Sequence, residues 1–456
     1  MYKKILIASL ALIAGLASCK KDDPTPSPNP PSTLTINGVA SNLEFYQLDT
    51  AHLSVAGVAK DAATKAVWAV NGAKAAEGAT FDFTTAHPGK YEVTLTVDGK
   101  SAKQTYTVAP RFSEGAFLLN EGNFGNETGS LTYIHPSKKL VIDQAYYRVN
   151  GTKLGNVCQD LAFGNDQIYI LSQLGPKNGG EGLLTIARSN SLEKVKVYND
   201  EALAQSTPTH IAVLRDHIYI RTERDGILRG SSEGGFTPIT GTKKALKQRM
   251  AQIGERLFAL TSDSKVLMIQ GTQVVRELDL SPAKPSGIAV SHDGKLWVST
   301  TSPNAILKVD PTPDNFVALD THILDKSISA TGPESWQRTT SSAFFAHGDK
   351  LYFTGQSSVI YCHDFATSKT SQVIDVKTID GVGTSANMYY NSLGVDPSTG
   401  ELYYAAFEGY NTYNKKNVTM VLKADGTKLL LKEQVNSFPA GFYFIPNAAN
   451  RTGANR

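Results

Sequence analysis

The chain has 456 residues, of which 41% are hydrophobic and 19% are charged, and its formal net charge is +3. This composition is ordinary for a globular protein, and a chain of this length can form two domains with large cores. The net charge is too small to argue for binding to nucleic acid or to an anionic surface, and no nucleic-acid partner is predicted. After the N-terminal segment, no stretch reaches the roughly 18 apolar residues that a membrane-spanning helix needs.

The N-terminus has the pattern of a bacterial lipoprotein signal. Two lysines precede an apolar run at residues 5–17, and the sequence Leu-Ala-Ser-Cys then ends at Cys19. This sequence resembles a lipobox, which implies that residues 1–18 are a signal peptide that is removed and that Cys19 is then acylated. Several acyl chains on one cysteine would anchor the protein stably in a membrane. A plain secretory signal is the alternative.

Residues 19–32 are predicted to form an extended, proline-rich tether. The residues Lys-Lys-Asp-Asp that follow Cys19 resemble the short signal that directs some lipoproteins of Gram-negative bacteria to the outer face of the outer membrane. A merely soluble flank is the alternative. The prolines between residues 24 and 31 favour an extended backbone that holds the protein away from the membrane. The resemblance therefore implies an outer-membrane protein that faces the exterior and contacts the membrane only through its lipid anchor.

Residues 33–109 are predicted to form a small immunoglobulin-like β-sandwich. Trp68 and the run Pro-Gly-Lys-Tyr-Glu-Val from Pro88 resemble bacterial PKD and immunoglobulin-like modules, in which the tryptophan fills the core. No cysteine lies in this segment, so the disulfide of antibody domains is absent. We interpret the module as a spacer, with glycan binding as the alternative. Apolar and polar residues alternate, as in half-buried strands, at 34–39, 52–58, 66–70, 80–83, 91–97 and 104–108.

A repeated hairpin pattern predicts that residues 112–446 form a seven-bladed β-propeller. The clearest copy lies at 287–300, where an alternating apolar strand, the turn Asp293-Gly294 and the residues Leu-Trp-Val follow one another. A spacing of roughly 40 to 55 residues between copies is typical of one four-stranded sheet per repeat. Five similar hairpins are expected at 161–171, 211–220, 250–260, 344–353 and 393–405.

The two ends of this region are predicted to complete the seventh blade. Residues 115–120 have the pattern of a return strand without a first strand, and residues 440–445 have the pattern of a first strand without a return. Pairing these segments would close the ring and remove its exposed sheet edges. The expected fold is therefore all-β, with a seven-bladed β-propeller preceded by a small immunoglobulin-like β-sandwich. Residues 447–456 are expected to be a disordered tail.

The cysteines of the predicted propeller fall in different blades. Cys158 lies near the start of one hairpin, and Cys362 lies in an outer strand of another repeat. A disulfide between them would need a longer reach than its geometry permits. Both are therefore predicted to be free thiols, even at an oxidising location.

The ligand site is predicted at one end of the propeller, where loops lead into the innermost strands and out of the second strands. These loops combine aromatic, amide and arginine side chains, which favour recognition of a bulky polar small molecule. Some of these side chains are instead expected to pack between blades. The candidate ligand-binding residues are Asn123, Gln159, Arg221, Arg249, Trp336, Arg338, Tyr390 and Tyr410.

Catalytic motifs are mostly missing from the sequence. It contains no GxSxG elbow, HExxH pair, phosphate loop or CxxC pair. His210 is the histidine that enters the predicted face, where we consider it a ligand contact rather than a metal ligand. We therefore predict a non-catalytic protein without a cofactor or a metal, and a hydrolase or lyase is the less favoured alternative. Carboxylates that could serve glycoside cleavage are Glu121, Glu223, Asp263 and Glu408.

The start of the predicted propeller resembles a known family. Residues 117–125, Phe-Leu-Leu-Asn-Glu-Gly-Asn-Phe-Gly, and the following Gly129-Ser130-Leu131 are similar to the opening of YncE-like seven-bladed propeller lipoproteins of Gram-negative bacteria. Some members of that family capture cobalamin at the cell surface and hand it to a TonB-dependent outer-membrane transporter. The resemblance therefore implies capture of cobalamin or another corrinoid, with such a transporter as the partner. The alternative is a surface scaffold or adhesin that binds glycan or protein through the same face.

Overall fold

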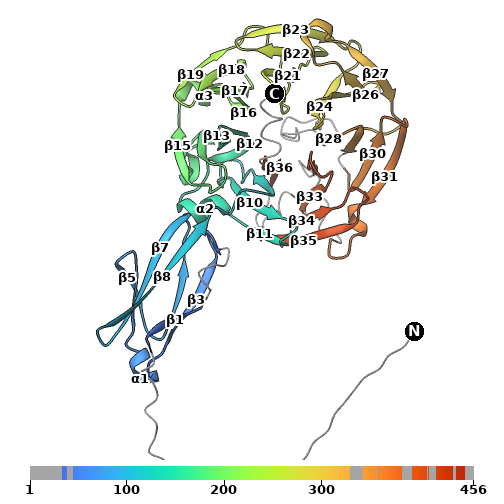
Figure 1. Cartoon of the computed structure of the whole chain (residues 1–456). Coiled ribbons are helices and arrows are strands. Elements are labelled where there is room, and N and C mark those ends of the chain that lie inside the picture. Colours follow the sequence, from blue (N-terminus) through green and yellow to red (C-terminus); the bar gives the residue numbers. More distant parts are fainter. Residues whose placement is uncertain are drawn as a thin grey trace, which may run out of the picture. The chain divides into compact units, whose positions relative to one another are not determined.

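The computed structural model describes residues 33–38, 45–328, 343–355, 357–382, 393–407, 409, 417–434 and 438–446 (Figure 1). The predicted signal peptide, the predicted tether with Cys19 and the predicted tail at 447–456 lie outside these residues. Two compact units are present. The first comprises Met1–Ser41, Ala51–Phe83 and Tyr91–Thr105, and the second comprises Asn42–Thr50, Thr84–Lys90 and Tyr106–Arg456.

The N-terminal strands form two sheets, as expected for a small sandwich, and each of the six predicted strands is found. One sheet has the order β1 (Thr35–Asn37), β3 (Thr50–Ala56), β6 (Thr80–Thr84). The other has the order β2 (Phe45–Tyr46), β8 (Lys100–Ala109), β7 (Gly89–Val97), β4 (Val67–Val70), β5 (Ala73–Glu77). A single-turn helix, α1 (Lys60–Ala63), follows β3.

Trp68 fills the core of this region, as predicted. Its side chain is fully buried, and its indole nitrogen donates a hydrogen bond to the carbonyl oxygen of Gly78 at 2.9 Å. Strand β5 was not expected, because its sequence Ala-Lys-Ala-Ala-Glu has low strand propensity. It forms because Asn71 and Gly72 both have positive φ angles, which make the tight turn that pairs β5 with β4.

Seven four-stranded antiparallel sheets follow in the described residues, as predicted for a seven-bladed propeller. The closing blade contains β36 (Pro439–Phe444), β9 (Ala116–Asn120), β10 (Ser130–His135) and β11 (Leu140–Ile142). Blade 2 contains β12 (Asn156–Gly164), β13 (Gln167–Gly175), β14 (Leu184–Arg188) and β15 (Lys194–Tyr198). Blade 3 contains β16 (Pro208–Leu214), β17 (His217–Thr222), β18 (Gly226–Ser231) and β19 (Gly234–Pro238).

The remaining blades repeat this arrangement around the axis (Figure 1). Blade 4 contains β20 (Ala251–Ile253), β21 (Arg256–Leu260), β22 (Lys265–Gln270) and β23 (Gln273–Asp279). Blade 5 contains β24 (Pro285–Val290), β25 (Leu296–Thr301), β26 (Asn304–Val309) and β27 (Ala318–Ile323). Blade 6 contains β28 (Phe344–His347), β29 (Lys350–Thr354), β30 (Val359–Asp364) and β31 (Lys369–Asp375). Blade 7 contains β32 (Leu393–Val395), β33 (Leu402–Phe407), β34 (Asn417–Leu422) and β35 (Lys428–Gln434).

Short helices lie in the connections between the propeller strands. They are α2 (Ala145–Asn150), α3 (Glu201–Gln205), η1 (Lys177–Gly179), η2 (Pro313–Asn315) and η4 (Val376–Thr378). None of the helices among the described residues has the length and apolar character needed to cross a membrane.

The closing blade joins the two ends of the propeller sequence, as predicted. Strand β36 pairs antiparallel with β9, so that Phe442 lies opposite Leu118 and Phe444 lies opposite Ala116. A register shift separates Pro439 from Gly441 in this pair. Strand β36 lies more than 300 residues after β9 in the sequence. Their pairing holds the two ends of the propeller together and leaves no exposed sheet edge at the junction.

Apolar side chains pack between neighbouring blades. Trp297 of β25 is fully buried and meets Phe365, which follows β30 in the next blade, in an edge-to-face contact with ring centroids 4.7 Å apart. The alternating residues that predicted the hairpins therefore form the cores between blades. Cys158 and Cys362 are buried free thiols in β12 and β30, as predicted.

Three inner strands share a bulge where the chain enters them. Register shifts follow Pro208 in β16, Pro285 in β24 and Pro439 in β36. Proline has no N–H group and is tolerated in sheets at edge strands and bulges, and an inner strand of a propeller is an edge strand that faces the axis. These bulges redirect side chains at one end of the axis, where the candidate site lies.

Candidate functional site

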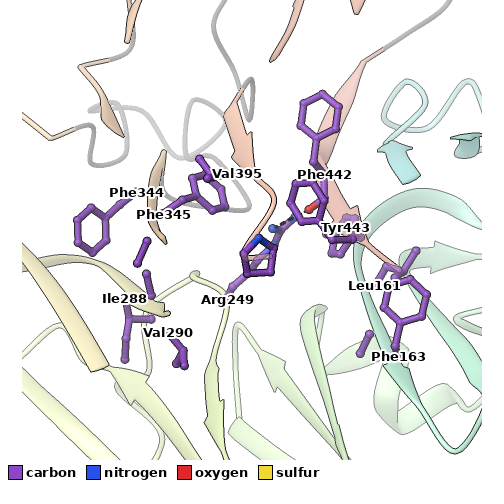
Figure 2. A pocket seen from close by; sticks show the side chains of 15 residues that line it. Leu161, Phe163, Arg249, Ile288, Val290, Phe344, Phe345, Val395, Phe442 and Tyr443 are labelled. Carbon is purple, nitrogen blue, oxygen red and sulfur yellow. Dashed lines mark hydrogen bonds between the residues drawn. The ribbon is translucent and has the colours of Figure 1, made fainter. Parts of the chain in front are cut away.

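A cavity of about 330 Å³ lies along the axis and is lined mainly by inner strands. We call it the axial chamber (Figure 2). Its size falls at the lower end of the range for small-molecule sites. Most of the side chains that line it are apolar. Representative lining residues are Leu161 and Phe163 of β12, Ile288 and Val290 of β24, Phe345 of β28 and Phe442 of β36.

Arg249, a predicted ligand-binding residue, is the charged residue among those that line the axial chamber. It precedes β20, and Figure 2 shows it reaching toward Phe442 and Tyr443. Its Nη1 donates a hydrogen bond to the Phe442 carbonyl oxygen at 3.2 Å, and its guanidinium carbon lies 4.0 Å from the centre of the Tyr443 ring. Glycine at position 441 permits this approach, because a Cβ atom there would lie 2.0 Å from Arg249 Nη2.

Asp160 lies beside Arg249 and is almost fully buried. Its Oδ1 is 3.4 Å from Arg249 Nε and accepts a hydrogen bond from the Tyr443 hydroxyl at 2.6 Å. Its Oδ2 accepts a hydrogen bond from the backbone N–H of Ile211 at 2.9 Å. Burial raises the pKa of Asp160, while Arg249 and these hydrogen bonds oppose the rise. Asp160 thus links blade 2 to blade 3, to the closing strand and to the arginine.

Gln159 and Asn123, two other predicted residues, lie close to this group. Gln159 directly precedes Asp160 in the bulged part of β12 and is buried, and its Oε1 has no hydrogen-bond partner among the described residues. Asn123 lies in the loop after β9, where its carbonyl oxygen accepts a hydrogen bond from Asn156 Nδ2 at 3.1 Å. The neighbouring Phe124 is 66% exposed. We call Asn123, Phe124 and Gln159 the axial rim.

Arg221, also predicted as a ligand contact, is instead committed to the protein. Its Nε and Nη2 donate to the carbonyl oxygen of Ala245 at 3.2 and 2.9 Å, and its Nη1 donates to Thr209 Oγ1 at 3.1 Å. The same nitrogen lies 3.0 Å from Glu223 Oε1. The side chain is buried, so these contacts favour a structural role that ties blade 3 to the segment leading into blade 4.

The other predictions for this face divide into two groups. His210 is fully buried in β16, and its Nδ1 lies 3.0 Å from Thr209 Oγ1. Burial favours a structural role for this histidine over a ligand contact. Four candidate ligand-binding residues, and the candidate lipidation site, lie outside the described residues: Trp336, Arg338, Tyr390, Tyr410 and Cys19.

The two described thiols have properties of structural rather than nucleophilic cysteines. Burial raises the pKa of the Cys158 thiol and raises that of Cys362 to about 11. The thiolate is the reactive form, so neither group is activated near neutral pH. The described part of the chain also contains no group of three or more histidine, cysteine or acidic side chains placed to hold a metal ion.

The blades and the cavity on their axis define the class of protein as a β-propeller, and comparison with solved structures agrees. A quinonprotein alcohol dehydrogenase-like protein from Bacteroides thetaiotaomicron VPI-5482 superimposes with a TM-score of 0.58 at 16% identity, over 92% of this chain and 98% of the other. A Lactobacillus plantarum protein gives a TM-score of 0.46 at 15% identity, over 73% of this chain and 99% of the other. At such low identity, the first likeness shows the fold alone.

The family follows from a sequence match. The family model described as "Domain of unknown function (DUF5074)" matches residues 114–446, and the chain belongs to this family. No curated protein matches the chain. The matched region begins just before β9 and ends just after β36, so the family corresponds to the propeller.

Several residues of the site were missed by the sequence analysis. Tyr443 falls in a predicted strand and Asp160 directly follows the candidate residue Gln159, but neither was selected. Phe163 and Phe345 fall in predicted hairpins, where their chamber-facing position depends on the register of the inner strands. A proline marks the bulges in β16, β24 and β36, but β12 is bulged without one and β16 does not line the chamber. This local feature could therefore have indicated only β24 and β36 among the lining strands.

Proposed function

We propose that this propeller is a non-catalytic binding protein that captures a bulky polar nutrient at the axial rim. A corrinoid such as cobalamin is the first candidate ligand, and a TonB-dependent outer-membrane transporter is the candidate recipient. The protein would be held by lipid at Cys19 on the outer face of the outer membrane. This ligand and partner rest on the resemblance to cobalamin-capture propellers.

The observation that carries the proposal is the buried Oε1 of Gln159, which has no hydrogen-bond partner among the described residues. A buried acceptor without a partner costs about 1–3 kcal/mol, so such groups usually meet a donor from water or a ligand. Corrinoids carry many amide side chains whose N–H groups would supply this donor. The exposed ring of Phe124 offers an apolar plane at the same end of the propeller.

Hydrogen bonds join the two blades that form the axial rim. The backbone N–H of Cys158, which precedes Gln159, donates to the carbonyl oxygen of Glu121 at 3.0 Å, and this bond joins the loop after β9 to β12. Asn156 adds side-chain hydrogen bonds to the same loop. The rim is therefore preorganised by bonds between two blades, which lowers the entropic cost of binding.

Calorimetry with cyanocobalamin tests the proposal on the mature protein. We expect the wild-type protein to bind with micromolar or tighter affinity. The affinity should fall at least tenfold in Gln159→Leu and in Phe124→Ala, which corresponds to a loss of about 1.4 kcal/mol or more of binding free energy at each residue. Leu319→Ala is the matched control, because Leu319 is an exposed apolar residue on the outer strand β27. The absence of heat with wild-type protein would discard the corrinoid.

Two cell experiments test the location. Cys19→Ala should move the protein from the membrane fraction to the soluble fraction, because acylation would be lost. Protease added to intact cells should digest the wild-type protein if it faces the medium. Protection from protease would show an inward-facing protein and would contradict capture at the cell surface.

A further inference from the structure

The axial chamber has a chemical character different from that of the axial rim. Phenylalanine, isoleucine, valine and leucine side chains form most of its wall, and the Tyr443 hydroxyl is already bonded to Asp160. Arg249 therefore contributes the cationic donor group among mostly apolar side chains. An apolar chamber with one charged group selects ligands that combine an apolar body with one charge of opposite sign.

Arg249 has hydrogen-bonding capacity that the described residues do not use. A guanidinium group has five N–H donors, and Arg249 places one hydrogen bond on the Phe442 carbonyl oxygen. Its Nε and Nη2 are buried and have no hydrogen-bond partner in the described part of the chain. The side chain as a whole is 22% exposed, so small molecules or solvent reach part of it. Buried donors of this kind are usually satisfied by water or by a ligand.

Asp160 is a limited partner for this charge. Its nearest oxygen lies 3.4 Å from Arg249 Nε, outside the usual range for a charge-assisted hydrogen bond. Both of its oxygens also accept stronger hydrogen bonds, from Tyr443 and from the backbone of Ile211. The guanidinium thus remains able to attract an anion into the chamber.

We propose that the axial chamber binds a monocarboxylate with an apolar body, such as a medium-chain fatty acid, whose carboxylate is held by the guanidinium group of Arg249. A carboxylate matches a guanidinium in charge and planar geometry, and an alkyl chain gains about 25 cal/mol for each Å² buried against apolar walls. This site is separate from the corrinoid site at the rim. It does not depend on the identity of the ligand captured there.

Octanoate and the uncharged 1-octanol are the probes, measured by calorimetry on the whole mature protein at neutral pH. Octanoate should bind wild type, and its affinity should fall at least tenfold in Arg249→Met, which keeps the length of the side chain and removes the charge. Arg249→Lys should recover part of the affinity. Arg188→Met is the matched control, since the side chain of Arg188 is 66% exposed and it is not among the residues that line the chamber.

The uncharged probe separates the charge from the apolar walls. The affinity for 1-octanol should be similar in wild type and Arg249→Met, because it needs only the apolar surface. Val290→Trp, which fills the chamber, should weaken both probes. Should that variant fail to fold, as judged by circular dichroism, the Arg249 variants decide the question alone.

Two results would overturn the proposal. One is the absence of saturable octanoate binding to wild type at millimolar concentration. The other is equal octanoate affinity in wild type and Arg249→Met, which would leave the arginine with only a structural role. Failure of cyanocobalamin to bind would leave the octanoate result unchanged, so the two proposals fail independently. Octanoate at saturation should also leave the affinity for cyanocobalamin unchanged.

Discussion

Arg221 and Arg249 both lie at the end of the propeller where the chain enters the inner strands, yet their guanidinium groups have different surroundings. Arg221 is surrounded by acceptors from Thr209, Ala245 and Glu223. Arg249 faces an apolar chamber, and two of its nitrogens have no hydrogen-bond partner among the described residues. Both residues are arginines at the same end of the propeller, although Arg221 lies in β17 and Arg249 precedes β20. Their hydrogen-bond partners are what separate a structural arginine from a candidate ligand-binding one.

The difference arises from what lies opposite each side chain. Arg221 projects toward the backbone of a neighbouring segment, which supplies the Ala245 carbonyl group. Arg249 projects across the axis to β36, where Phe442 supplies one carbonyl group and Tyr443 supplies a ring face. The closing strand therefore creates the surroundings of Arg249 but contributes none of the contacts described for Arg221.

Deleting residues 438–456 should have the largest effect, because it removes β36 and the contacts of Arg249 together. We expect the propeller to lose its cooperative unfolding transition in calorimetry, since β9 and the core of the closing blade become exposed. Deleting only residues 447–456 is the matched control, because it leaves β36 whole. A 438–456 deletion that melts like wild type would show that closure by β36 is dispensable.

Arg221→Met should reduce the free energy of unfolding by about 2–3 kcal/mol. The substitution leaves the Ala245 carbonyl group without these donors and Glu223 without its cationic partner. Urea unfolding monitored by fluorescence measures the change, and octanoate affinity should not change. A stable Arg221→Met variant with weakened octanoate binding would reverse the roles that we assign to the two arginines.

Asp160→Asn should destabilise the protein by about 2 kcal/mol near pH 4, because an amide nitrogen cannot accept the hydrogen bond from Ile211. The raised pKa of Asp160 means that the folded protein binds its proton more tightly than the unfolded chain does. Its contribution to stability is therefore present below the ordinary carboxyl pKa, about 4, and is lost as the pH rises through the raised pKa.

The effect of Asp160→Asn on the free energy of unfolding should depend on pH. The stability difference between wild type and Asp160→Asn should be largest at low pH and should shrink toward neutral pH. Urea unfolding of both proteins across this range measures it. A difference that stays constant, or that grows with pH, would show that burial does not raise the pKa of Asp160.

Arg249→Met should have the smallest effect on stability, within about 1 kcal/mol of wild type. The variant loses a cation–π contact and one hydrogen bond, but it also removes buried donors that have no described partner. Thermal unfolding in the absence of ligand measures the change. A loss as large as that of Arg221→Met would indicate that Arg249 mainly secures the closing strand.

The sequence by itself determined the architecture. The alternation of apolar and polar residues in segments such as 287–300 indicates which side chains are buried between blades. This inference needs only the two-residue period of a β-strand. Residues 115–120 and 440–445 each have the pattern of one strand of a hairpin without the other strand. They therefore predicted that the two ends of the propeller sequence pair and close the ring. Strand β5 was missed because alanine, lysine and glutamate have low strand propensity, and its turn and its pairing with β4 override that preference.

Only the tertiary structure decided which residues of the axial end face a ligand. Arg221 and Arg249 have the same chemistry in the sequence, and their partners lie in segments that the chain brings near through ring closure and inner-strand bulges. Phe442 is 193 residues from Arg249, and Tyr443 is 283 residues from Asp160. Local periodicity carries no information about such distant pairs, because each is fixed by the register of a strand contributed from the other end of the propeller.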